Sequence, residues 1–382
     1  MLEREKVRYI EDKMKEYKGY SILNYHVLEG MADWVRVVDK KGIVIYANKT
    51  MCDDLGENLE GRKCYEPLGK YAPCNYCITQ RSIETAEIVQ KEEKVGNNYY
   101  SVKSSPIFDS NGNIYAAVEV FRDITREKRL ERELKEKNKK MRTDLIFART
   151  LQEKILPHKG VYKNIKLDFI YRPCDMLSGD MFDIYQIDDK HLGIYISDVA
   201  GHGVTASMMT MFVRQTMRSI SSDYVSPAET LTELHKRFID LGLEDENYFT
   251  IFYGILNTET NELKYSNAGH NCIPILFNDD KIKLMKIRGF PISYIFESIH
   301  YIENSIQLKK GDRMLFYTDG ITEIENLKNE QFGLEGVLAI VNRDIKNNNG
   351  SNTLKSINSE IKKFRWGDHE DDYAVVLMEV LE

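Results

Sequence analysis

Four short motifs in the second half of the chain each place an aspartate next to an apolar, strand-like run. Residues 191–197 and 312–317 are runs that lead into an aspartate, and residues 373–378 follow one. Because strand ends hold their side chains in fixed positions, such aspartates can gather at one edge of a sheet. The motifs are Ser178-Gly179-Asp180, Asp198-Val199-Ala200-Gly201, Thr318-Asp319-Gly320 and Asp371-Asp372.

Carboxylates gathered in this way need a cation. Like charges a few ångströms apart repel one another and raise their pKa values. Oxygen ligands suit Mg²⁺ or Mn²⁺ better than Zn²⁺, which prefers nitrogen and sulfur. Two such ions sharing a carboxylate would activate water and hold a phosphoryl group for in-line attack, which predicts phosphate ester hydrolysis. Each motif alone is more simply explained as ordinary turn chemistry, so the prediction depends on all four together.

Residues 145–382 resemble the SpoIIE-like serine phosphatases of the metal-dependent protein phosphatase (PPM) superfamily. The resemblance implies an α/β-sandwich in which two antiparallel sheets, with helices outside, carry a two-metal site at one edge. The segments that carry it are Arg172-Pro173, 178–183, 198–203, the methionine-rich helix 206–217, 267–271, 318–320 and Asp371-Asp372.

The resemblance also implies roles for individual residues. Asp180 and Asp198 would bind metal, with Asp198 bridging two Mn²⁺ or Mg²⁺ ions and the backbone carbonyl of Val199 as a further ligand. Asp319 and Asp371 would complete the shell of the second ion. These four aspartates are therefore the expected catalytic residues.

The sequence departs from the family pattern at three places. Ser178 stands where a glycine is usual, which matters only if the backbone there needs a positive φ. Tyr373-Ala374 follows the last motif in place of the usual pair, so the choice between Asp371 and Asp372 as ligand stays open. Ile292-Ser293 replaces a common leucine and glycine, which points to a surface specific to this chain.

Two histidines lie beside the motifs. His202 precedes the helix that follows the second motif, and His270 lies in a Gly-His turn. A pKa near neutrality would suit either to general acid catalysis, but capping, positioning or an ordered hydrogen bond explains each equally well.

Upstream, residues 20–126 are predicted to form an α+β sensor that resembles a PAS domain. Two strand-like runs are followed by a helical middle and then by three further runs. A charged helix leaves the domain after Asp123-Ile124-Thr125. The predicted strands are residues 34–38, 43–46, 86–94, 99–108 and 114–122, and Asn48 is expected at a helix start.

Four of the six cysteines fall within the helical middle of this sensor, namely Cys52, Cys64, Cys74 and Cys77. Four thiolates are able to hold an iron–sulfur cluster or zinc. A reversible thiol switch and simple burial of small apolar side chains are the alternatives. The other two cysteines, Cys174 and Cys272, are expected in the core of the catalytic half.

A charged linker without glycine or proline before Pro157 joins the two halves. The predicted domains are a helix over 1–19, the sensor over 20–126, the linker over 127–157 and the phosphatase over 158–382. Apolar side chains recur in the linker mostly at three- and four-residue steps, which predicts a coiled-coil seam and a parallel homodimer. Asn138 interrupts the seam, and the alternative is a single solvated helix. Residues 148–157 also resemble the family's regulatory helix, which abuts the phosphatase core. The apolar positions are Leu130, Leu134, Met141, Leu145, Ala148, Leu151 and Ile155.

The formal net charge of −7 argues against nucleic acid as the main partner, and no apolar run is long enough to cross a membrane. The sequence therefore predicts a cytoplasmic, signal-regulated protein serine/threonine phosphatase. By resemblance its substrate is a phosphorylated STAS-type anti-sigma-factor antagonist, and its output is partner switching. A small-molecule or redox signal is expected at the PAS domain. The alternatives are a non-catalytic sensor and scaffold that binds the same partner, and a phosphatase of a small phosphoester.

Overall fold

A computed structural model describes residues 24–220, 225–243, 247–347, 350–367 and 371–382 of the 382-residue chain. The chain divides into two compact units, Met1–Lys140 and Met141–Glu382. The helix predicted over residues 1–19 lies outside the described residues. Among the helices that the structure describes, none is both long and apolar enough to span a bilayer.

The first unit is built on a five-stranded antiparallel sheet with the strand order β2-β1-β5-β4-β3. The predicted order of two strands, helices and three strands is confirmed, except that the third strand begins at Val89 rather than at residue 86. Ala86 has a φ of 60° and ends α3, so the chain turns before it extends. The elements are β1 Trp34–Asp39, β2 Val44–Ala47, α2 Lys49–Leu55, α3 Ile78–Thr85, β3 Val89–Val95, β4 Asn98–Phe108 and β5 Ile114–Asp123.

Asn48 connects this sheet to its helices. Its Oδ1 accepts hydrogen bonds from the backbone N–H of Met51, which caps α2, and from that of Val35 in β1. The side chain is fully buried, as is expected for an amide whose polar atoms are all used within the fold. The core beside it contains Trp34 stacked on Tyr100, with ring centroids 4.3 Å apart.

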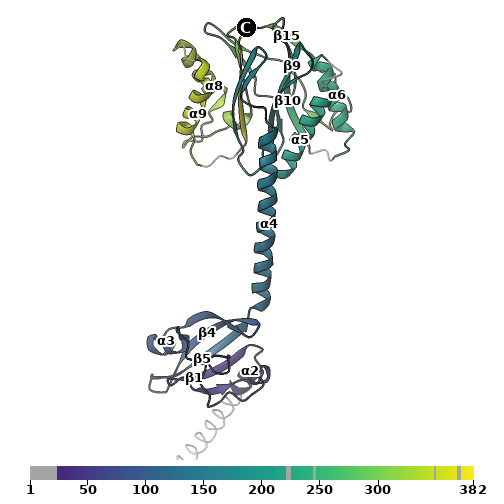
Figure 1. Ribbon diagram of the computed structural model, residues 1–382. Coiled ribbons are helices and arrows are strands. Elements are labelled where there is room, and N and C mark those ends of the chain that lie inside the picture. The colour runs from purple at the N-terminus through teal and green to yellow at the C-terminus, as the bar shows by residue number, and fades with distance from the viewer. Residues whose placement is uncertain (1–23, 221–224, 244–246, 348–349, 368–370) are drawn as a thin grey trace, which may run out of the picture. The chain divides into compact units, whose positions relative to one another are not determined.

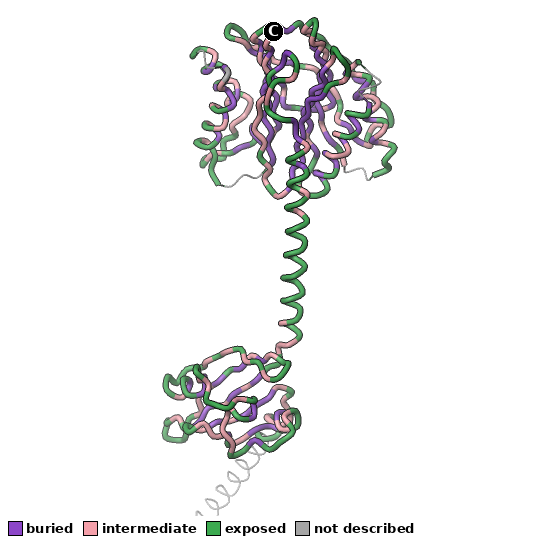
Figure 2. Tube along the Cα trace, in the orientation of Figure 1, coloured by how far each residue is buried: buried purple, intermediate pink, exposed green. Residues whose placement is uncertain are grey.

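Helix α4, Thr125–Ile155, contains 31 residues and passes from the first unit into the second. Most of its surface is exposed (Figure 2). The side chains of Leu134 and Met141 are each 60% exposed, and that of Leu130 is 52% exposed. Among the residues that the structure describes, none covers this stretch of the apolar stripe predicted from the sequence.

The second unit contains two six-stranded sheets, and all their strand pairs are antiparallel. One sheet has the order β15-β11-β10-β9-β8, with β14 beside β10, and the other has the order β13-β12-β16-β17-β7-β6. The strands are β6 Gly160–Tyr162, β7 Ile165–Arg172, β8 Asp180–Gln186, β9 His191–Val199, β10 Tyr248–Asn257, β11 Glu262–Ala268, β12 Ile275–Phe277, β13 Ile282–Leu284, β14 Ile292–Ser293, β15 Asn304–Gln307, β16 Arg313–Tyr317 and β17 Tyr373–Val380.

The two sheets share one hydrophobic core. Phe169 of β7 packs on Phe182 of β8 with ring centroids 4.8 Å apart, and Phe252 of β10 packs on Phe316 of β16 at 5.9 Å. Helices α5 and α6 cover the first sheet, while α8 and α9 form a second core with the other (Figure 1). The helices are α5 Gly203–Ile220, α6 Pro227–Ile239, α7 Asp319–Thr322, α8 Gly333–Lys346 and α9 Thr353–Phe364, with a short 3-10 turn at Gly350–Asn352.

Candidate active site

The predicted acidic residues lie where the two sheets meet. Asp180 is the first residue of β8 and is paired across the ladder with Asp198, near the end of β9. Asp319 follows β16, and Asp371 lies just before β17, the neighbour of β16. Strand pairing within each sheet and packing between the two sheets thus bring together residues that are up to 191 positions apart (371 − 180).

The electrostatics of these carboxylates show that they act on one another. Burial and the charges of Asp319 and Asp371 raise the pKa of Asp198 to about 8. Burial and the charge of Asp371 raise the pKa of Asp319 to about 6. Burial and the charge of Asp198 raise the pKa of Asp180 well above its usual range. Glu323, which sequence reasoning missed, adds to the first two shifts. An oxygen-rich, mutually repelling group of this kind fits a divalent cation.

Asp371 and Asp372 have opposite environments, although they are neighbours in the sequence. Asp372 is 4% exposed, and its carboxylate accepts hydrogen bonds from the backbone N–H of Cys174 at 2.7 Å and of Gly179 at 2.6 Å. Asp371 is exposed at the rim. Both oxygens of Asp372 are therefore engaged in holding the 174–179 loop, which leaves Asp371 as the better placed ligand.

Glycines allow the loops of the site to approach closely. A Cβ on Gly179 would lie 2.9 Å from the carbonyl oxygen of Gly201 and 3.0 Å from that of Val199. A Cβ on Gly320 would lie only 1.9 Å from the carbonyl oxygen of Asp372. Larger side chains at either glycine would push apart the segments that carry the aspartates, including the Val199 carbonyl that sequence analysis predicted as a ligand.

Thr318 is a positioning residue that sequence reasoning did not single out. Its hydroxyl donates to Asp180 Oδ2 at 2.7 Å and accepts from the N–H of Ala374 at 2.9 Å, so it joins both sheets. The sequence feature that could have identified Thr318 is its position directly before Asp319-Gly320. Ser178 does not adopt a positive φ, so its departure from glycine causes no backbone strain. Its hydroxyl accepts from the N–H of Asp180 at 3.1 Å.

His270 is buried and bridges two strands. Its Nε2 lies 3.1 Å from the carbonyl oxygen of Tyr317, and its Nδ1 lies 3.2 Å from Thr250 Oγ1. Burial lowers the pKa of His270 to about 4. The ring is therefore neutral at pH 7, donating from Nε2 and accepting at Nδ1, since a carbonyl only accepts. This arrangement favours the ordered hydrogen-bonding role over general acid catalysis. His202 is exposed directly before α5.

Cys174 is beside the site, not in the core, which corrects the sequence prediction. Its thiol, with one carboxylate oxygen each from Asp371 and Asp372, forms a group whose atoms lie within 4.8 Å of one another. Burial and a hydrogen bond to Asp372 raise the pKa of the thiol to about 12, so it stays protonated. Cys272 is buried as expected.

Gln152, near the end of α4, is inserted beside the first acidic motif. Its Nε2 donates to the carbonyl oxygen of Ser178 at 2.8 Å and to Thr210 Oγ1 at 3.2 Å, and its Oε1 accepts from the N–H of Ser178 at 3.0 Å. The side chain is 1% exposed. The last turn of α4 thus holds the backbone two residues from Asp180.

In the first unit, which was predicted to be a sensor, Cys64, Cys74 and Cys77 line one cavity, whereas Cys52 lies on α2 with its thiol near the Ala47 carbonyl. Within the described ranges, Cys174, Asp371 and Asp372 are the one group of three or more potential metal ligands whose atoms lie within 4.8 Å of one another. The four sensor thiols therefore do not form a ready metal site here, and the predicted cluster or zinc gains no support from the geometry.

Comparison with known proteins identifies the family of the second unit. The family described as "Stage II sporulation protein E (SpoIIE)" matches residues 188–381, which is half of the chain. The chain belongs to the SpoIIE family. A PAS domain matches residues 32–126, so the SpoIIE domain follows a PAS domain in this chain.

Two relatives from Bacillus subtilis (strain 168) match part of this SpoIIE-family chain. "Phosphoserine phosphatase RsbP" is 31% identical over 185 residues, covering 47% of this chain and 45% of that protein. "Phosphoserine phosphatase RsbU" is 24% identical over 187 residues, covering 48% of this chain and 54% of that protein. The chain therefore spans about half the length of these relatives. Among solved structures, the SiaA-PP2C domain of Pseudomonas aeruginosa covers 63% of this chain and 98% of its own, with a TM-score of 0.55 and 17% identity, which shows a PP2C-type fold.

Proposed function

We propose that the chain is a signal-regulated, metal-dependent protein serine/threonine phosphatase. The observation that carries the proposal is the convergence of Asp180, Asp198, Asp319 and Asp371 where two sheets pack together, with the pKa values of Asp180, Asp198 and Asp319 raised by burial and by neighbouring carboxylates. Membership of the SpoIIE family and two relatives named phosphoserine phosphatases support it. All four carboxylates are present, which argues against a non-catalytic scaffold.

The residues divide into ligands and positioning groups. Asp180, Asp198, Asp319, Asp371 and the Val199 carbonyl would hold two Mn²⁺ or Mg²⁺ ions, which when bound activate water and orient a phosphoryl group. Thr318 fixes the carboxylate of Asp180, and Asp372 fixes the 174–179 loop. Fixed carboxylates keep the geometry of such a site within the narrow limits that catalysis requires.

The proposed substrate is a phosphorylated STAS-type anti-sigma-factor antagonist in a cytoplasmic partner-switching pathway. The family resemblance supports this choice, and the exposed position of Asp371 suits a site that a protein loop reaches from outside. A small phosphoester as substrate is the alternative. Comparing turnover of a phosphorylated STAS protein with that of free phosphoserine separates the two, because a protein phosphatase gains transition-state binding from surfaces remote from the phosphate.

The proposed route of regulation is α4. Its exposed apolar stripe supports a parallel homodimer, and Gln152 holds the Ser178 backbone at its far end. A change of dimer packing that moved this helix would be transmitted to the first acidic motif. Replacing Met141 and Leu145 together with lysine should give monomers in sedimentation and altered basal activity, whereas Lys140→Glu should do little. A monomeric double variant with unchanged activity and signal response would reduce α4 to a tether.

Metal dependence tests the proposed activity. Purified protein should release phosphate from a phosphoserine protein or an aryl phosphate with Mn²⁺ or Mg²⁺, and chelation should abolish the reaction. Asp198→Asn and Asp319→Asn should each lose most turnover while the circular dichroism spectrum is retained. Asp280→Asn, in an exposed turn, is the matched control. Full turnover in both site variants would refute the dimetal assignment.

A further inference from the structure

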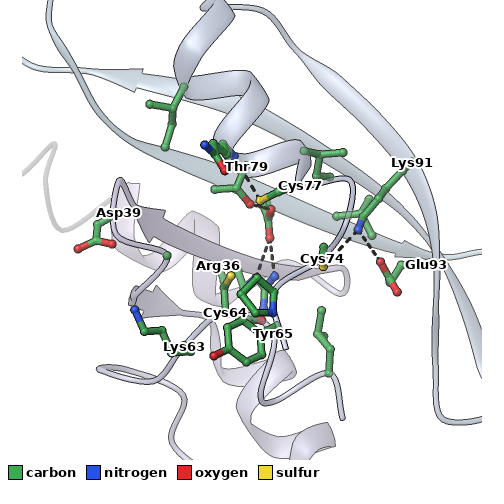
Figure 3. A pocket seen from close by; sticks show the side chains of 18 of the residues that line it. Arg36, Asp39, Lys63, Cys64, Tyr65, Cys74, Cys77, Thr79, Lys91 and Glu93 are labelled. Atoms are coloured by element: carbon green, nitrogen blue, oxygen red, sulfur yellow. Dashed lines mark hydrogen bonds and ion pairs between the residues drawn. The ribbon is translucent and has the colours of Figure 1, made fainter. Parts of the chain in front are cut away.

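The sensor domain contains a cavity of about 330 Å³ that the proposed phosphatase reaction does not use. Its lining includes three cysteines, the ion pair of Arg36 with Glu119 and several lysines. Figure 3 labels the three cysteines together with Arg36, Lys63 and Lys91. The thiols are the nucleophilic groups of this cavity. The question is whether any of them has surroundings that make it reactive.

The ion pair does not supply a binding group for a charged ligand. Arg36 Nε lies 2.7 Å from Glu119 Oε2, and the guanidinium also donates to the Cys64 carbonyl. Thr79 donates its hydroxyl to the other Glu119 oxygen. Arg36 and Glu119 are 3% and 2% exposed, so these contacts are internal to the fold. The pair therefore builds the wall of the cavity.

Cys74 lies between two ammonium groups. Its Sγ is 3.3 Å from Lys70 Nζ and 3.8 Å from Lys91 Nζ. Glu93 holds both lysines in place, at 2.7 Å from Lys70 and 2.6 Å from Lys91. Neighbouring cations stabilise negative charge on a cysteine sulfur and so favour its reaction as a nucleophile. Of these two lysines, Lys91 lines the cavity, and Figure 3 shows it beside the thiol of Cys74.

Cys77 has a different but also polarising environment. It caps the N-terminus of α3, and its Sγ accepts from the N–H of Gln80 at 3.4 Å. The partial positive charge at a helix N-terminus stabilises a developing thiolate. Cys64 provides the contrast within the same cavity, because burial raises the pKa of its thiol to about 11 and leaves it protonated.

The chain bends between Cys74 and Cys77 at Asn75 and Tyr76, both of which are exposed. Cys74 and Cys77 lie three positions apart in the sequence and line the same cavity, and the C-x-x-C spacing is one at which two thiols form a redox-active disulfide. We propose that Cys74 and Cys77 form a peroxide-reactive dithiol, in which Cys74 is the attacking thiol and Cys77 the resolving one. The sensor would then be a site of reversible oxidation by a hydroperoxide.

The reaction balances with one hydroperoxide. Cys74 gives its thiol proton to solvent and its sulfur attacks hydrogen peroxide, so that an S–O bond forms and the O–O bond breaks, and the leaving hydroxide takes up one proton from solvent to become water. The sulfur of Cys77 then attacks the Cys74 sulfenic acid; an S–S bond forms, the S–O bond breaks, and the second water carries away the thiol proton of Cys77. The two thiols are oxidised, and the peroxide is reduced.

Mass spectrometry of the full-length protein tests this proposal without reference to phosphatase activity. Trypsin cleavage after Lys70 and Arg81 places both cysteines in one peptide, residues 71–81. After limiting hydrogen peroxide and alkylation, this peptide should lack two hydrogen atoms and carry no label, while Cys64 is alkylated. In Cys77→Ser, dimedone should label Cys74.

Variants of the lysines separate a polarised thiol from one that is merely accessible. Lys70→Met with Lys91→Met should slow oxidation of Cys74 roughly fivefold or more. Lys70→Arg with Lys91→Arg keeps the charge and should keep the rate, and Cys64→Ser should also leave it unchanged. The proposal is wrong if Cys64 oxidises as fast as Cys74, if the methionine pair reacts at the original rate, or if only disulfides between chains form.

Discussion

Replacing Gln152 with alanine should weaken both the fold of the catalytic unit and its affinity for metal. The substitution removes three buried hydrogen bonds and leaves the N–H and C=O of Ser178 without their side-chain partner. Each buried polar group left unpaired costs about 1–3 kcal/mol. Water that enters the space left by the Gln152 side chain would pair with some of these groups. We therefore expect the free energy of unfolding to fall by about 2–4 kcal/mol.

The same change should reach the metal site, because Ser178 is two residues from Asp180. If Mn²⁺ binding has to supply about 1.4 kcal/mol to order the loop around Ser178, the affinity for Mn²⁺ falls about tenfold. Chemical denaturation measures the stability, and isothermal titration calorimetry measures the Mn²⁺ affinity. Glu153→Ala is the matched control, since it removes only an exposed ion pair with Arg149 and should cost less than about 1 kcal/mol.

Two results would refute this reasoning. A Gln152→Ala protein as stable as the control would show that the Ser178 backbone is satisfied in another way. A destabilised protein with unchanged Mn²⁺ affinity and unchanged turnover would show that the end of α4 supports the fold without being coupled to the site.

The remaining predictions concern the acidic rim and the buried histidine. Asp371→Asn should abolish metal-dependent turnover with little change in the free energy of unfolding. Asp372→Asn should lower the free energy of unfolding by about 1.5–3 kcal/mol, because its amide nitrogen would face one of the two backbone N–H groups that the carboxylate now accepts from. Equal unfolding curves for the two variants would contradict the assignment of Asp371 as ligand and Asp372 as loop anchor. Mn²⁺ at a hundred times its dissociation constant should stabilise the wild-type fold by about 2.7 kcal/mol but stabilise Asp198→Asn far less, as measured by thermal unfolding. The folded-state pKa of His270, about 4, lies below the unfolded value, so its contribution to stability is present above pH 6.5 and is lost as the pH falls. Between pH 6.5 and 5, wild type should lose up to about 2 kcal/mol more than His270→Gln, and parallel pH profiles would show that the buried ring takes up a proton without penalty.

Local patterns in the sequence were enough to predict the sensor fold and the strands that carry the site. Period-two alternation and turn residues identify strands one at a time, and the aspartates stand out because each adjoins such a run. The order of strands and helices in the PAS domain follows from these local signals, whereas the phosphatase family was identified by the resemblance of the acidic motifs to those of a known family. The start of the strand β3 was misplaced because the positive φ of Ala86 cannot be read from its residue type.

The tertiary structure decided what depends on contacts between distant segments. Asp371 and Asp372 are chemically identical neighbours, yet only the packing of the 174–179 loop shows which carboxylate is engaged by backbone amides. The roles of Thr318 and Gln152 are likewise set by partners far away in the chain, as is the placing of lysines around Cys74. A sequence records the periodicity of each element, whereas hydrogen bonds across sheets and loops depend on how the elements pack, and that information is not local.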